Sequence, residues 1–172
     1  ALHRLQETSR RLLRAYDDYE FHAVYHGLHN FCALDLSSFY LDILKDRLYV
    51  SPPKSRKRRS AQTALHEILE TLVRLMAPIL SFTADEIWQV MPGDRGPSVH
   101  ADLFVPVETS YLNPELAARW ETVSRVRREV TRALESARKE KRIGHSLDGA
   151  VTLGVSEQLR EALSPFEAQL RS

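Results

Sequence analysis

The stretch that decides the fold is Phe31–Tyr49, FCALDLSSFYLDILKDRLY. It begins with an apolar run, passes through the polar segment Asp35–Ser38 and resumes as an amphipathic run. Apolar residues that recur at spacings of three and four are typical of a helix with one buried side. The pattern predicts one helix over residues 20–34 and another over 37–48, with a break or kink between them near Asp35–Ser38.

The same helical spacing recurs on both sides of this stretch. It predicts further helices over residues 2–15, 60–76, 84–91 and 115–142, with a loop over 92–114. Asn113 and Pro114 are expected as the N-cap and first residue of the longest helix. Gly27 interrupts an otherwise continuous apolar stripe, which indicates close packing at that position. The fold class is therefore mainly α, a helical bundle, and we expect residues 1–143 to belong to it.

Residues 144–172 show a different pattern. The run GAVTLGV at 149–155 predicts a strand, and 157–163 predicts a short helix. One strand does not make a sheet, so its partner is expected beyond Ser172. We therefore expect the chain to be a piece of a longer protein.

Composition bounds the function only loosely. The 172 residues are 43% apolar with six glycines, enough for one folded domain, or one domain and part of another. A net charge of +1 indicates no particular partner. The only cysteine, Cys32, cannot form an internal disulfide, which fits a reducing compartment. No apolar run approaches the ~18 residues of a membrane span, so no membrane association is expected.

Positive charge is concentrated in two places. Between Lys45 and Arg59 the chain has seven basic residues and one acidic residue, including a basic loop expected over residues 54–59. Lys and Arg beside aromatic residues suit RNA, because cations bind phosphates and rings stack on unpaired bases. A solvated loop and a nuclear-import signal are the alternatives. Phe39 and Tyr40 are adjacent and cannot both face a helical core, so one could stack on a base, or one could lie on the flank of the bundle.

The second concentration lies in the longest helix. Its arginines Arg125, Arg127, Arg128 and Arg132 could extend a phosphate-binding surface, but glutamates between them favour a solvated face equally.

No pattern of catalytic or metal-binding residues stands out. His22, His26 and His29 share one helical face, but no carboxylate or cysteine is placed to complete a metal site. Glu70 reads as an ordinary acid on a helix surface. We therefore assign no catalytic and no metal-binding residue.

Four segments, read as strings, closely resemble the C-terminal part of isoleucyl-tRNA synthetases, which are class I aminoacyl-tRNA synthetases. They are YEFHAVYHGLHNFCALDLSSFYLDILKDRLY (19–49), RRSAQTALHEILETLVRLMAPILSFTADEIW (58–88), SVHADLF (98–104) and VRREVTRALESARKEKRIGHSLDGAVTL (126–153). They cover most of the chain in the family's order. Synthetases for valine and leucine share the bundle, but SSFYLDxxKDRLY and RRSxQTAL look like the isoleucine family in particular.

The resemblance implies a helical bundle that binds the anticodon stem-loop of tRNA(Ile) and positions it for catalytic and editing domains upstream. ATP and Mg would act in that catalytic domain, and zinc, where present, in a C-terminal element that this chain lacks. Residues 144–172 would begin a small C-terminal α/β module, truncated here. The protein would be cytoplasmic and monomeric.

The resemblance, together with the charge pattern, implies a set of RNA-binding residues: Phe39, Tyr40, Lys45, Arg47, Lys54, Arg56, Lys57, Arg58, Arg59 and Gln62. The same region of a valine-type synthetase is the nearest alternative. A helical interaction module whose basic loop meets an acidic protein or a membrane surface is the other.

Overall fold

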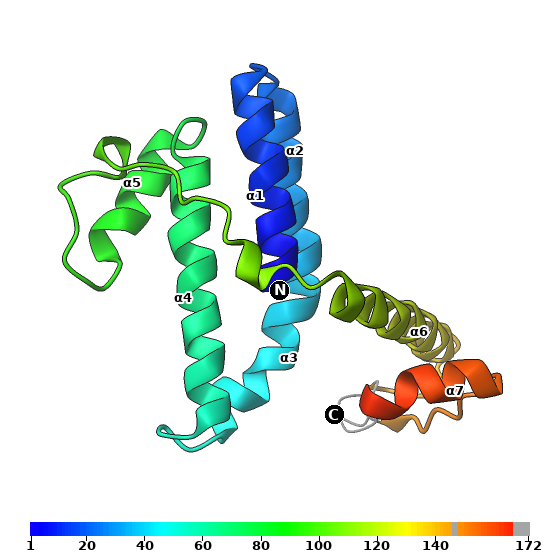
Figure 1. Cartoon of the computed structure of the whole chain (residues 1–172). Coiled ribbons are helices and arrows are strands. Elements are labelled where there is room, and N and C mark those ends of the chain that lie inside the picture. Colours follow the sequence, from blue (N-terminus) through cyan, green and yellow to red (C-terminus); the bar gives the residue numbers. More distant parts are fainter. Residues whose placement is uncertain (146–147, 167–172) are drawn as a thin grey trace. The chain divides into compact units, whose positions relative to one another are not determined.

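The computed structural model describes residues 1–145 and 148–166, and this part of the chain is mainly helical with no strand (Figure 1). Its elements are α1 (Leu2–Asp17), α2 (Phe21–Asn30), the π-helix η1 (Phe31–Tyr40), α3 (Leu41–Lys45), the π-helix η2 (Asp46–Val50), α4 (Arg56–Met76), α5 (Ser81–Val90), the 3₁₀ turns η3 (Val99–Ala101) and η4 (Thr109–Tyr111), α6 (Pro114–Lys139), α7 (Glu157–Leu163) and the 3₁₀ turn η6 (Ser164–Phe166). The predicted mainly α class is confirmed. The chain divides into two compact units, Ala1–Leu112 and Asn113–Ser172.

The first unit is built around α1, α2, η1 and α4, which share one apolar core. Its buried residues are Leu5, Leu12, Ala15, Val24, Leu28, Phe31, Leu36, Ile68, Leu72 and Leu75. The Tyr16 hydroxyl, at the end of α1, donates to the Leu75 carbonyl of α4 at 2.7 Å. Burial of this hydroxyl raises the pKa of Tyr16 to about 12, so it remains a donor at physiological pH.

Gly27 of α2 lies directly against Leu12 of α1, which confirms the predicted close packing. A Cβ atom at Gly27 would lie 2.5 Å from Cδ2 of Leu12, well inside van der Waals contact. Leu12 is fully buried and cannot easily move away.

We expect Gly27→Ala to destabilise the first unit by about 1–2 kcal/mol, because overpacking against Leu12 outweighs the better helix propensity of alanine. Denaturant unfolding measures this, with Gly96→Ala as a control because nothing lies within 4 Å of its added methyl group. Unchanged or increased stability of Gly27→Ala would contradict the close contact.

No break occurs at Asp35–Ser38, where a break or kink was expected, because the chain stays helical from Phe21 to Val50 and the π-helix η1 runs through this segment. Phe31 and Leu36 are both buried although they are five residues apart. That spacing is out of phase with an α-helix but in phase with the i→i+5 repeat of a π-helix. The apolar pattern therefore indicates a break only when an α-helical period is assumed.

A second apolar cluster joins α4 to α5 and the segment that follows, with Val73, Ala77, Ala84, Trp88, Met91 and Val99 buried. The guanidinium groups of Arg74 and Arg95 lie 4.7 Å and 4.8 Å from the centre of the Trp88 ring. Both arginines also bind the carboxylate of Glu70. The expectation that Glu70 is an ordinary surface acid is therefore wrong.

In the second unit, α6 packs against α7 and η6 through Val123, Leu163 and Phe166. The predicted cap is confirmed: the Asn113 side chain accepts the Leu116 N–H at 2.9 Å, and Pro114 is the first residue of α6. The contacts group α6 with α7, whereas the sequence predicted a domain boundary at residues 143 and 144.

The expected strand at residues 149–155 is wrong, because these residues are irregular. A strand needs a hydrogen-bonded neighbour, and none of the residues 1–145 and 148–166 supplies one. The predicted helix at 157–163 is confirmed as α7. That residues 144–172 begin an α/β module stays a prediction, and its parts at 146–147 and 167–172 lie outside the described residues.

Candidate nucleic-acid interface

The chain reverses direction between η2 and α4, and we call residues 45–62, which form this turn, the basic tip (Figure 1). The Ser51 N–H donates to the Asp46 carbonyl at 3.1 Å, which closes the last π turn. Pro52 and Pro53 follow, and because proline has no N–H they end the helix there, as predicted.

The helix after the turn starts earlier than predicted. Ser55 has an extended backbone, and its Oγ accepts the Arg58 N–H at 3.3 Å, so Ser55 is the N-cap of α4. Arg and Lys are good helix formers and continue directly from this cap. The expected loop over residues 54–59 is therefore wrong from Arg56 onward, because Arg56–Arg59 form the first turn of α4.

Most of the predicted RNA-binding residues are exposed on the basic tip: Lys45, Arg47, Lys54, Arg56, Lys57, Arg59 and Gln62. Two of the predicted cations already have protein partners. Lys45 Nζ lies 2.9 Å from Asp42 Oδ1, and the half-buried Arg58 donates from Nη1 to the Ser51 carbonyl at 3.3 Å. Arg58 therefore helps to close the turn, and its role as a nucleic-acid contact stays a prediction.

The other predicted cations of the basic tip form no ion pair with any carboxylate among the described residues. They are Arg47, Lys54, Arg56, Lys57 and Arg59. Elsewhere in the chain exposed arginines do pair, as Arg138 does with Glu135 at 2.8 Å. Five cations of the basic tip thus have no carboxylate partner among the described residues.

The backbone of α4 adds to this positive charge. A helix N-terminus carries a partial positive charge and unsatisfied N–H groups, so acids are favoured there and cations are unfavourable. The first turn of α4 contains no acid and four cations. A bound anion would relieve the repulsion among these groups.

The two predicted stacking residues, Phe39 and Tyr40, lie in η1, before the basic tip in the sequence. Both are half-buried. Tyr40 packs against the core of the first unit. Burial raises the pKa of Tyr40, and the charge of Arg47 acts in the opposite direction. Tyr40 is therefore the inward-facing member of the pair, and the role of Phe39 as a stacking residue stays a prediction.

Sequence reasoning missed the aromatic residue that is exposed on the basic tip. Tyr49 is 81% exposed and its neighbour Val50 is 78% exposed, in the last turn before Pro52. Helical spacing gives the signal for this exposure. Tyr40 and Leu44 follow the buried stripe at a spacing of four, which next reaches residue 48, and Tyr49 lies one residue beyond it.

Gln62 is exposed in the second turn of α4, on the same end of the helix as the free cations. Its amide has both donor and acceptor atoms, the combination that reads base edges.

The described part of the chain offers neither a metal site nor a membrane-spanning helix. No group of three or more His, Cys, Asp or Glu side chains there could hold a metal ion. None of the described helices is long and apolar enough to cross a membrane.

Comparison with known proteins assigns a family to this arrangement. Residues 1–153 match the family described as the anticodon-binding domain of tRNA ligase. The chain is 51% identical to the isoleucine–tRNA ligase of Syntrophotalea carbinolica over 173 residues, which cover 100% of this chain and 19% of that protein. It is 50% identical to the isoleucine–tRNA ligase of Moorella thermoacetica, with 99% and 18% covered. For the isoleucine–tRNA ligase of Natranaerobius thermophilus the identity is 45%, with 97% and 18% covered.

Proposed function

The chain belongs to the anticodon-binding domains of tRNA ligases, and on this premise we propose that its basic tip binds the anticodon stem-loop of tRNA(Ile). The observation that carries the proposal is the set of exposed, unpaired cations at the positive end of α4. Phosphate is the ligand that such a surface attracts most strongly.

The cations of the basic tip supply affinity. Arg47, Lys54, Arg56, Lys57 and Arg59 bind phosphates and release the counterions that RNA carries. These contacts hold the stem-loop in position but carry no sequence information. Their strength falls as salt rises, because released counterions then gain less entropy.

Two side chains supply contacts to bases. Tyr49 is the exposed ring among the cations and stacks on an unpaired base of the loop. Gln62 hydrogen-bonds to the edge of a base through its amide. Unpaired anticodon bases are suited to both contacts, because their edges are not engaged in base pairs and they can turn outward from the loop.

The ligase reaction itself would take place outside this chain. The chain spans 18–19% of the length of the curated relatives quoted above. We propose that it positions tRNA(Ile) for catalytic and editing domains of a longer parent protein, and ATP and Mg²⁺ would act in the catalytic domain. Zinc, where the parent protein carries it, would bind in a C-terminal element outside this chain.

The proposal is tested by titrating the chain with fluorescent anticodon stem-loops of isoleucine and valine tRNAs at several salt concentrations. We expect tighter binding of the isoleucine stem-loop, with log affinity falling by about 0.7 per log unit of salt for each phosphate bound. Equal binding of both would assign the chain no anticodon preference. Absence of binding at low salt, with binding to acidic protein or anionic vesicles instead, would favour an interaction module with a basic surface.

Tyr49 offers a sharper test of base contact. We expect Tyr49→Ala to weaken stem-loop binding by about 1–3 kcal/mol, the usual contribution of one stacked base, and Tyr49→Phe to retain most of it. Because Tyr49 is exposed, neither variant should change thermal stability appreciably. Equal affinity of both variants and the unchanged chain would remove Tyr49 from the interface.

A further inference from the structure

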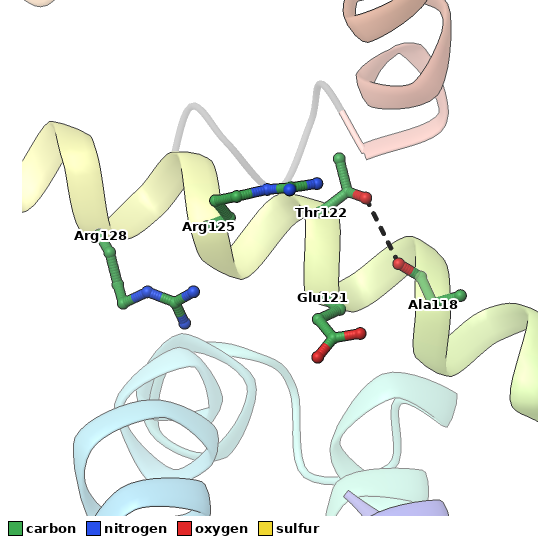
Figure 2. Close-up of a pocket in the computed structure, with 5 residues that line it drawn as sticks. All are labelled: Ala118, Glu121, Thr122, Arg125 and Arg128. Atoms are coloured by element: carbon green, nitrogen blue, oxygen red, sulfur yellow. Dashed lines mark hydrogen bonds between the residues drawn. The ribbon is translucent and has the colours of Figure 1, made fainter.

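A polar recess of about 220 Å³ lies on α6, in the second unit, far along the chain from the basic tip (Figure 2). It is lined by Ala118, Glu121, Thr122, Arg125 and Arg128, which recur along α6 at intervals of one, three and four residues. Figure 2 shows the side chain of Arg128 on the same side of the helix as Glu121, and that of Arg125 extending along the helix toward Thr122.

The two arginines of this recess differ from their neighbours on the same helix. Arg119 pairs with Glu115 at 2.5 Å, and Arg138 pairs with Glu135 at 2.8 Å. Arg125 and Arg128 are exposed and form no ion pair with a carboxylate in the described part of the chain. The alternative reading of α6, a solvated face whose charges neutralise one another, therefore fails at these two positions.

The other polar groups of the recess limit what it can bind. The Thr122 hydroxyl donates to the Ala118 carbonyl at 3.4 Å, so its hydrogen is already used and only acceptor capacity remains. Glu121 is an acceptor that neither arginine neutralises through an ion pair. The donors left for a ligand are the guanidinium groups of Arg125 and Arg128, whose planar forks match phosphate oxygens.

Arg125 is also placed between two different surfaces. Besides the polar recess, it borders a neighbouring groove of about 310 Å³ that is lined partly by Val126, Leu153 and Leu159. An arginine stem beside apolar residues loses less freedom when its guanidinium binds a ligand.

We propose that Arg125 and Arg128 bind phosphate groups of RNA and form a second RNA contact, separate in sequence from the basic tip. The inference rests on the proposed function, because it assumes that the chain binds RNA. It adds a contact in the second unit, with Arg125 and Arg128 as phosphate-binding residues and Glu121 as a group that opposes binding.

The test compares two variants of equal charge. Arg125→Ala with Arg128→Ala should weaken binding of a full isoleucine tRNA roughly tenfold and make the plot of log affinity against log salt shallower by about 1.4, because two phosphate contacts are lost. Arg119→Ala with Arg138→Ala removes the same charge from the same helix, but at arginines that already pair with glutamates. This variant should change the affinity and its salt dependence much less. Equal effects of the two double variants would overturn the proposal.

Glu121 supplies a test of opposite sign. Glu121→Gln should strengthen tRNA binding by a few-fold, since it removes a negative charge close to the phosphate. Weaker binding of Glu121→Gln would show that Glu121 orients the arginines and would contradict the proposed arrangement. If the unchanged chain binds no tRNA, the proposed function itself fails. If it binds and only basic-tip variants weaken it, the α6 contact alone is refuted.

Discussion

Replacing Arg56, Lys57 and Arg59 together by alanine should weaken binding of the isoleucine anticodon stem-loop roughly 30- to 100-fold at about 0.1 M salt. These residues are exposed and unpaired, so the loss reflects two or three phosphate contacts. The salt dependence should become shallower by about 0.7 for each contact removed. Titration of labelled stem-loop at several salt concentrations measures both quantities.

The fold should tolerate this triple variant. Cations in the first turn oppose the helix dipole, so removing three of them should leave thermal stability unchanged or raise it by up to about 1 kcal/mol. Arg58 is kept, because it closes the turn through the Ser51 carbonyl. Ser55 is also kept, because its hydroxyl caps the start of α4.

A matched control lies on α1, away from the basic tip (Figure 1). Arg10, Arg11 and Arg14 are exposed and likewise form no ion pair with a described carboxylate. Their triple alanine variant loses the same charge and should keep nearly all of its affinity. If the two triple variants bind equally weakly, the effect is one of net charge and the basic tip is not the site.

The second large effect concerns stability and centres on Glu70. Hydrogen bonds from Arg95 lower the pKa of Glu70 most, and those from Arg74 lower it further, to about 2. The same arginines cover the buried ring of Trp88, whose Nε1 donates to the Gly96 carbonyl at 2.9 Å. Glu70 thus joins α4, α5 and the segment after α5.

Glu70→Gln should lower the free energy of unfolding by about 2 kcal/mol near neutral pH. The charge-assisted hydrogen bonds from Arg74 and Arg95 would weaken, and these two cations would remain close together without a carboxylate between them. Glu67→Gln, one turn away on α4, is the control and should change stability by less than about 0.5 kcal/mol. Chemical denaturation measures both. A loss as small as that of the control would mean that the ion pairs of Glu70 with Arg74 and Arg95 contribute little to stability.

The difference in unfolding free energy between the unchanged protein and Glu70→Gln should depend on pH in one direction. Because the pKa of Glu70 in the folded protein lies at about 2, below its ordinary value of 4.5, its stabilisation is complete above the ordinary value. This stabilisation is lost as the pH falls from the ordinary pKa of Glu70 toward its pKa in the folded protein. The stability gap between the unchanged protein and Glu70→Gln should therefore shrink over that interval, and a gap independent of pH would contradict the ionic origin.

Helical periodicity alone predicts most of this fold. The stripes of α2 and α4 and the cap at Asn113 follow from local rules of spacing and hydrogen bonding. Where the period itself changes, those rules fail. The polar segment Asp35–Ser38 predicts a break or kink, but a π-helix that suits the five-residue spacing of buried Phe31 and Leu36 continues through it. The apolar run at 149–155 also misleads, because strand formation depends on a partner and not on composition.

The candidate site is predicted in part for similar reasons. Clustered charge is visible in sequence, so the cations of the basic tip are predicted together. Which of them are free is decided by contacts that form only in the folded chain, such as that of Arg58 with the Ser51 carbonyl across the turn. The pairing of Glu70 with Arg95 likewise depends on how segments distant in the sequence pack, whereas the exposure of Tyr49 follows from its phase on the helix.

Hydrogen exchange of the chain with and without the isoleucine anticodon stem-loop tests the central claim most directly. The loop of the basic tip and the first turn of α4 contain N–H groups without helical partners, which exchange readily unless a ligand covers them. The account predicts slower exchange over residues 51–59 in the saturated complex and no change over α1. Unchanged exchange across the basic tip in that complex would contradict it, wherever else protection occurred.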